Sequence, residues 1–199
     1  IQVNVYDGST WSGAQTLQAP RGTQATPKVV SDDTGYMVWW TNRGPNDQHI
    51  NFYASISTTG AADAFGESTR VTDDVERQLR VERVVGSAAG YAAVFESRPN
   101  PESPIDIVAL VWDGNEFSAL TTIESNEPDA FLLGLEGNES GFVAVVNQND
   151  STERIRPKTM SAIVYAEGAW QEGIALEASD QRLGDQGASV AEIAAFEDS

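Results

Sequence analysis

The feature that most constrains this 199-residue chain is an aromatic residue that follows a tight turn and recurs four times. These aromatics lie 54, 52 and 53 residues apart along the chain: Trp11, Phe65, Phe117 and Trp170. A glycine follows each of the first three after 24, 25 and 24 residues: Gly35, Gly90 and Gly141. A period near 50 built from short strands predicts four-stranded sheets that stack on one another, because one such sheet cannot bury its own faces.

The strands within each period are short apolar or alternating runs between turn residues. The first whole period predicts strands at 26–31, 36–41, 49–56 and 65–71. The second predicts strands at 79–85, 91–96, 105–112 and 117–123, and the third at 130–135, 142–147, 160–165 and 170–176. The N-terminal part adds two strands, 1–6 and 11–17, and the C-terminal part adds one or two between about 183 and 198. The segment 188–196 has a helix-like composition, but it lies where the period places strands.

The turn before three of the repeat aromatics contains glycine: Asp7-Gly8, Asp113-Gly114 and Glu167-Gly168. An Asp-Gly pair between two strands favours a type I′ hairpin, because glycine readily adopts the positive φ that this turn requires. We therefore expect three tight hairpins of that type. The paired aspartates Asp32-Asp33 and Asp73-Asp74 directly follow strands, so we expect them to bond their own backbone in turns rather than to act as paired catalytic carboxylates.

These copies resemble the β-propeller repeats of secreted and surface proteins of bacteria and archaea. The likeness is carried best by Tyr6-Asp-Gly-Ser-Thr-Trp11, Trp112-Asp-Gly-Asn-Glu-Phe117 and Tyr165-Ala-Glu-Gly-Ala-Trp170. The first copy is also similar to the Asp-box turn of sialidase-like propellers, although Tyr6 stands where that box has aspartate. The resemblance implies an all-β, single-domain propeller over 1–199, with about four blades whose terminal strands pair to close the ring, or else a fragment of a larger propeller. The repeats are approximately 1–24, 25–78, 79–129 and 130–187, with a partial copy at 188–199.

Charge restricts the partners. Thirty acidic residues and twelve basic ones give a net charge of −18, and only Lys28 and Lys158 are lysines. Such a chain is unsuited to phosphate backbones or anionic membrane surfaces, so we expect neither nucleic acid binding nor membrane insertion. Two explanations of the acidity stay open: solubility of an extracellular or cell-surface protein, or adaptation to high salt, which screens repulsion between like charges.

Few residues of this sequence are of the types that commonly act in catalysis or metal binding. There is no cysteine, and His49 is the single histidine. His49 opens a predicted strand, where a surface residue is more common than a catalytic base, and one histidine cannot form a cluster of histidine metal ligands. The segment 147–153 spaces oxygen-bearing side chains as a calcium loop does, but it lacks the glycine and the closing glutamate of that loop. Asn138 and Asn149 begin glycosylation sequons, a pattern that also arises by chance in such turns. We expect no catalytic residue, metal or cofactor.

One candidate site lies in the loops between the second and third strands of the repeats. These loops contain the candidate ligand-binding residues Arg43, Arg98, Arg154 and Arg156. Forked guanidinium groups bind carboxylate or sulfate, whereas solvated loop charges are the alternative. We expect a non-catalytic extracellular or cell-surface module that contacts protein or glycan through this loop face. The alternatives are a glycoside-active, sialidase-like enzyme and a structural repeat of a surface layer or filament. Trp39 and Trp40 are expected in the core, because stacked sheets would cover both of their faces.

Overall fold

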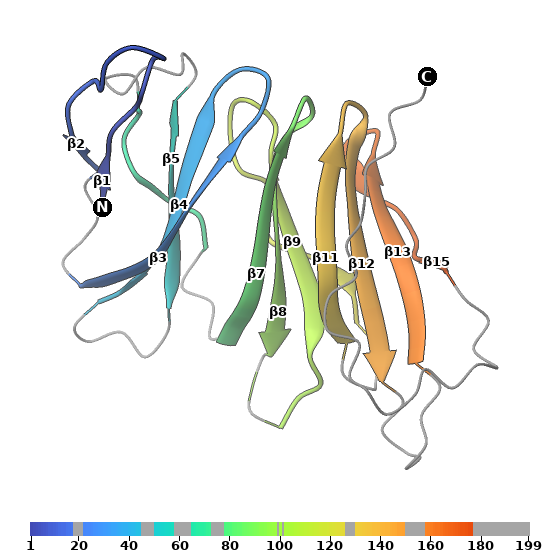
Figure 1. The fold of residues 1–199 in the computed structure, drawn as a ribbon. Coiled ribbons are helices and arrows are strands. Elements are labelled where there is room, and N and C mark those ends of the chain that lie inside the picture. The colour runs from blue at the N-terminus through green and yellow to red at the C-terminus, as the bar shows by residue number, and fades with distance from the viewer. Residues whose placement is uncertain are drawn as a thin grey trace. The chain divides into compact units, whose positions relative to one another are not determined.

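The computed structural model describes residues 1–17, 22–44, 50–57, 65–72, 78–98, 100, 102–125, 130–149 and 158–176. Every regular element in these ranges is a β-strand, which confirms the all-β class (Figure 1). No helix in the described ranges is long and apolar enough to cross a membrane. The chain divides into two compact units, Ile1–Glu76 and Arg77–Ser199, and each is considered by itself below.

The first unit contains a two-stranded and a four-stranded antiparallel sheet. The two-stranded sheet consists of β1 (Gln2–Val3) and β2 (Gln15–Thr16). The four-stranded sheet follows chain order through β3 (Thr23–Ser31), β4 (Tyr36–Arg43), β5 (Asn51–Ser57) and β6 (Thr69–Arg70). An up-and-down order of this kind brings every strand beside its neighbour in sequence.

The second unit contains two more sheets of the same design. One orders β7 (Gln78–Ser87), β8 (Gly90–Arg98), β9 (Asp106–Trp112) and β10 (Thr121–Glu124). The other orders β11 (Ala130–Asn138), β12 (Gly141–Asn149) and β13 (Lys158–Ala166), whose outer edge pairs with both β14 (Ala169–Trp170) and β15 (Ile174–Ala175). All pairings are antiparallel. The described strands form separate sheets and no closed ring.

The four copies share one pairing register. In each copy the repeat aromatic pairs with the residue before its turn: Tyr6 with Trp11, Ser57 with Phe65, Trp112 with Phe117, and Tyr165 with Trp170. In each copy a further pair joins the residue four positions after the aromatic to the residue three positions before the aromatic's partner. These pairs are Val3 with Gln15, Ala54 with Thr69, Ala109 with Thr121, and Ala162 with Ile174. The internal repeat inferred from spacing is therefore also a repeat of hydrogen-bonded structure.

The fourth strands are shorter than the sequence predicted. The continuous strands expected at 65–71, 117–123 and 170–176 are wrong, because pairing stops after the aromatic and resumes four residues later. At Phe117 the cause is the next residue, Ser118, whose hydroxyl accepts the Val111 N–H at 3.0 Å; Gly66 and Gln171 stand at this position in the other two copies, so this cause applies to one copy only. The side chain takes the place of a backbone acceptor, which interrupts the ladder.

A neighbouring carbonyl group explains why glycine recurs at this position of the repeat. A Cβ built on Gly90 would lie 2.1 Å from the Trp112 oxygen, and one built on Gly141 would lie 2.0 Å from the Tyr165 oxygen. Both glycines begin the second strand of a sheet, next to the end of the third strand. Only a residue without a side chain allows this approach of two backbones.

The expected type I′ turn forms at Glu167-Gly168, where both φ angles are positive (55° and 80°). It is wrong for Asp7-Gly8 and Asp113-Gly114, where only the glycine has a positive φ. Instead, the Asp7 carboxylate accepts the N–H groups of the residues two and three positions later at 2.8 and 2.7 Å, and Asp113 does the same at 2.9 and 3.0 Å. The carboxylate replaces the backbone acceptor of the turn.

Asp32 caps its turn in the same way, accepting the N–H groups of Thr34 and Gly35 at 2.7 and 2.8 Å. The interpretation of Asp32 as a turn aspartate is therefore confirmed. The pair Asp73-Asp74 lies outside the described residues.

Each unit has its own apolar core. In the first unit the core joins Leu17 of the N-terminal hairpin to Val38, Trp40, Tyr53 and Phe65. In the second unit one core is shared by the sheets β7–β10 and β11–β13, so these consecutive sheets pack face to face. Trp39 and Trp40 are both fully buried, which confirms their expected role in packing. Trp40 stacks on Tyr53, with ring centroids 6.1 Å apart.

Candidate binding face

The connections between the second and third strands lie at one end of each sheet, which we call the loop end. At this end seven residues join β4 to β5, seven join β8 to β9, and eight join β12 to β13. At the opposite end four residues join β3 to β4, and two join both β7 to β8 and β11 to β12. The connections from one copy to the next also leave from the loop end, because the strands alternate in direction. The opposite end also has the connections from the third to the fourth strand, eleven residues from β5 to β6 and eight from β9 to β10.

Arg43 and Arg98 occupy the same position of the repeat at the loop end. Arg43 is the last residue of β4 and lies seven residues after Tyr36, while Arg98 is the last residue of β8 and lies seven after Tyr91. Tyr36 and Tyr91 pair with Ser57 and Trp112, the equivalent residues of β5 and β9. Arg43 is exposed and Arg98 is half-buried.

The remaining arginines of the hypothesis are not tested. Arg154 and Arg156 lie outside the described residues, and in the copy 130–187 the position equivalent to Arg43 and Arg98 is occupied by Asn149. Arg43 belongs to the first unit and Arg98 to the second. The equivalence of Arg43 and Arg98 is therefore a property of the repeat, established separately in each unit.

Buried polar side chains lie beneath the loop end of the first unit. Asn42 (2% exposed) faces Asn51 (7% exposed) across the pairing of β4 and β5. The Arg70 guanidinium donates to Asn51 Oδ1 at 2.5 Å, and Thr72 Oγ1 accepts the Phe52 N–H at 3.1 Å. These bonds anchor the strand ends that carry the loops. The sequence analysis missed them, although polar residues closing each apolar run were a usable signal.

In the second unit a carboxylate links consecutive copies close to Arg98. Glu96 lies two residues before Arg98, so both side chains project from the same face of β8. Glu96 Oε1 accepts the N–H of Leu132 on β11 at 3.1 Å. Ser97 projects from the other face, is fully buried, and its hydroxyl finds no hydrogen-bond partner among the described residues. The Glu96 carboxylate, held by this hydrogen bond, thus lies on the same strand face as Arg98. This arrangement favours a ligand that offers both hydrogen-bond donors and acceptors.

The other candidate groups have structural roles or lie outside the described residues. His49 and most of the calcium-like segment 147–153 are among the latter. Asn138 is exposed in the turn between β11 and β12, where its Oδ1 accepts the N–H groups of Ser140 and Gly141 at 2.9 and 3.1 Å. Among the described residues no group of three or more His, Cys, Asp or Glu side chains could hold a metal ion.

Among the described residues two carboxyl groups, those of Asp7 and Asp113, have a shifted pKa, and both lie at the ends of the sheets opposite the loop end. Hydrogen bonds from the backbone N–H groups of Thr10 and then Ser9 hold the pKa of Asp7 well below its usual range. The N–H groups of Glu116 and then Asn115 lower the pKa of Asp113 in the same way. These bonds favour the ionised form, so both shifts belong to turn structure rather than to an acid–base site.

Comparison with known proteins adds no relative: the chain matches no protein-family model, no curated protein and no solved structure.

Proposed function

We propose that this chain is a β-propeller-type repeat module that is not catalytic and binds a protein or a glycan through its loop end, outside the cell or on its surface. Three features support the propeller: four copies with one register, sheets in up-and-down order, and face-to-face packing of consecutive sheets in the second unit. In propellers, four-stranded blades repeat in this way around an axis.

The observation that carries the binding proposal is the equivalent placement of Arg43 and Arg98 at the loop end. Arginines that recur at one repeat position are presented in the same orientation relative to each sheet. A guanidinium group forms two parallel bonds to a carboxylate or sulfate, so a partner with repeated anionic groups fits such an arrangement. The net charge of −18 makes these few cations the exception on the surface.

The partner class that follows is an anionic glycan or a carboxylate-rich protein surface. Charge-assisted contacts weaken as salt screens them. Binding should therefore decline with rising ionic strength and should depend on the arginine side chains.

The proposal is tested with an array of sialylated, sulfated and neutral glycans at low salt. The double variant Arg43→Ala, Arg98→Ala should bind the anionic members at least tenfold more weakly than the unchanged chain. Arg83→Ala is the control, because Arg83 is exposed in the interior of β7; it removes one positive charge, as each of the single variants Arg43→Ala and Arg98→Ala does, and the three are compared on the same array. Equal binding by the double variant and the control would leave the arginines as ordinary solvated charges.

The same glycan array distinguishes a binding module from the enzymatic alternative. Release of free sialic acid from the sialylated members would support a sialidase-like propeller and contradict a purely binding role. Intact sialylated members with arginine-dependent retention would support the binding module.

A further inference from the structure

Strand β1 has a partner on only one of its two edges. It pairs with β2, and it has no second partner strand among the described residues. The equivalent strands of the other copies, β5, β9 and β13, also pair with the second strand of their sheet, which is β4, β8 or β12. One strand-binding edge of the repeat is therefore open in the described part of the first copy.

The open edge presents the backbone groups of alternate residues. The carbonyls of Val5 and Ile1 accept N–H groups from the second half of the hairpin at 2.9 and 3.0 Å, so these residues point toward β2. Because backbone groups alternate in direction along a strand, Gln2, Asn4 and Tyr6 point the other way, and we call their N–H and C=O groups the β1 edge. The segment contains no charged residue and no proline, which commonly protect exposed edges.

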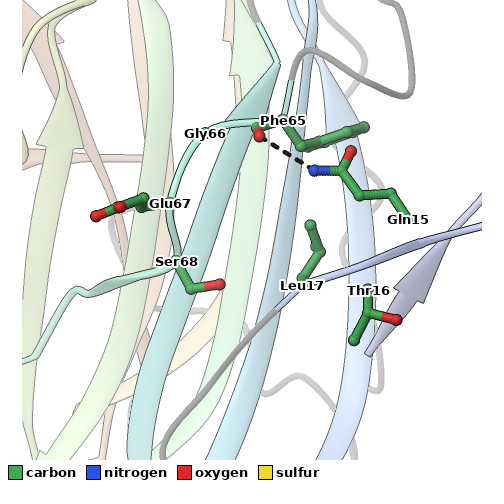
Figure 2. Close-up of a pocket in the computed structure, with 7 residues that line it drawn as sticks. All are labelled: Gln15, Thr16, Leu17, Phe65, Gly66, Glu67 and Ser68. Carbon is green, nitrogen blue, oxygen red and sulfur yellow. Dashed lines mark hydrogen bonds between the residues drawn. The ribbon is translucent and has the colours of Figure 1, made fainter.

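The β1 edge faces β3, the first strand of the neighbouring sheet. On the far side of the hairpin, Gln15 of β2 donates to the Phe65 carbonyl at 3.3 Å, which places β2 beside the segment that leads to β6 (Figure 2). On the near side, the Ile1 nitrogen donates to Gln24 Oε1 of β3 at 2.6 Å. A strand added to the β1 edge would therefore extend the hairpin over β3.

Val29 of β3 is uncovered on the face that such a strand would cover. It pairs with Val38, which packs in the core with Leu17 of the hairpin. Val29 is 64% exposed, whereas its equivalent in β11, Leu135, is 7% exposed and lies in the core shared with the preceding sheet. That preceding sheet has four strands, while the hairpin before β3 has two. The exposure of Val29 is thus a second sign of a missing strand.

The other copies show which residues fit this edge. The strands that occupy it there have a glycine followed by an aromatic residue and four uncharged residues. The glycine–aromatic pairs are Gly35-Tyr36, Gly90-Tyr91 and Gly141-Phe142. A Cβ on Gly90 or Gly141 would meet the carbonyl of Trp112 or Tyr165, and Tyr6 is the equivalent of these two residues. An added strand therefore needs glycine opposite Tyr6.

Carboxylates lie where the added strand would begin. A strand antiparallel to β1 starts beside Tyr6, at the end of the sheets opposite the loop end. Asp7 follows Tyr6, and Asp32 and Asp33 follow β3 at the same end. Hydrogen bonds, the strongest from the Thr10 N–H, hold the pKa of Asp7 well below its usual range, so its carboxyl group is ionised at neutral pH. A cationic residue before the glycine would be attracted to these charges.

We propose that the β1 edge binds an extended segment of a partner protein by strand addition. The segment has a cationic residue, then glycine, an aromatic residue and four uncharged, mainly apolar residues. A second folded copy of this chain does not offer β4, β8 or β12 for this purpose, because each is paired on both edges. The site is separate from the loop-end arginines and does not depend on them.

The test uses the whole chain and a fluorescent peptide, Lys-Lys-Gly-Phe-Val-Ala-Val-Val-Asn, whose last seven residues copy 141–147. Fluorescence anisotropy should show saturable binding. In the register of β12 with β13, the N–H groups of the peptide's phenylalanine and alanine face the β1 edge. N-methylation of these two residues should weaken binding about tenfold or more, because two hydrogen bonds are lost. N-methylation of the first two valines, whose N–H groups face away, is the matched control and should leave binding unchanged.

Variants of the chain test the same contact from the other side. Asn4→Pro removes an N–H of the β1 edge and should weaken binding of the peptide about tenfold. Asn4→Ala is the matched control, because it loses the same side chain and keeps the N–H. Circular dichroism verifies that both variants keep the fold. A peptide with two glutamates in place of the lysines should bind more weakly at low salt.

The inference is overturned if the unmodified peptide does not bind the whole chain, as would happen if other residues of the chain fill the edge. It is also overturned if the two N-methylated peptides bind alike, because the contact would then not depend on the backbone groups of the edge. Equal binding of the lysine and glutamate peptides would overturn the assignment of a cationic segment.

Discussion

Gly90→Ala adds a single methyl group and should strongly destabilise the fold of the second unit. The added Cβ would lie 2.1 Å from the Trp112 carbonyl oxygen, and Gly90 has a φ of +105°, which L-residues rarely adopt. The strained backbone costs about 1–3 kcal/mol. Forcing an extra methyl group against packed backbone costs about 1–3 kcal/mol more. The expected loss in the free energy of unfolding is therefore about 2–6 kcal/mol.

Gly114→Ala separates the two contributions. Gly114 has nearly the same φ, +99°, but a Cβ at this position would have nothing within 4 Å. Its substitution should cost only the strain, about 1–3 kcal/mol. Urea denaturation of both variants, followed by tryptophan fluorescence and far-ultraviolet circular dichroism, gives the two free energies. Equal losses would refute the argument that the Trp112 carbonyl requires a glycine at position 90.

Three further predictions concern packing, salt and pH. Trp40→Ala removes a fully buried indole and should cost about 3–5 kcal/mol, whereas Trp170 is half-buried and Trp170→Ala should cost about half as much; equal denaturation midpoints would contradict this difference. The thermal midpoint should rise from low to molar potassium chloride, because screening relieves the repulsion of a −18 net charge, and a flat or falling midpoint would remove the salt-adaptation hypothesis. The pKa of Asp113 is lowered in the folded chain, so its contribution to stability is present above the unfolded pKa near 3.9 and is lost as pH falls through the folded value. Carboxyl NMR titration should place that folded pKa below 3.8, and Asp113→Asn should remove this part of the acid sensitivity; a folded pKa at or above 3.8 would disprove the capping argument.

The sequence predicted the inner strands well because two independent signals agree there. The run from Tyr36 is rich in β-branched and aromatic residues and starts directly after a turn, so its strand was expected at 36–41 and is found as β4 at Tyr36–Arg43. The outer strands were predicted with less success. After Phe117 the Ser118 hydroxyl replaces a backbone acceptor, and strand periodicity does not report that competition.

The features of the candidate sites also differ in how far the sequence alone predicts them. The common position of Arg43 and Arg98 follows from their equal distance from the start of a strand, which spacing along the chain can reveal. The hydrogen bond from Gln15 to the Phe65 carbonyl could not be found from spacing, because it needs two segments 50 residues apart to lie side by side. Contacts between copies of the repeat depend on how the sheets pack, and no local pattern encodes them.

The four repeat aromatics show which structural feature corresponds to the period of the sequence. All four occupy one register position, yet Trp11 is 65% exposed while Phe65 is 7% exposed. In three copies the partner across the turn is also aromatic, with ring centroids 5.2, 4.9 and 5.3 Å apart. In the remaining copy the partner is Ser57, and Phe65 packs into the core instead.

Equivalent positions of the repeat therefore differ in burial: Trp11 is exposed, whereas Phe65 lies in the core. What the copies share is the cross-strand pairing that closes a hairpin, and an aromatic pair of this kind contributes about 0.5–1.5 kcal/mol beyond its buried area. Burial depends instead on what packs against the hairpin. Because pairing is local and burial is not, the period is kept in the sequence even where the aromatic, such as Trp11, is exposed. The spacing of aromatics thus identifies the hairpins of this repeat, and the cores must be read from the packing of the sheets.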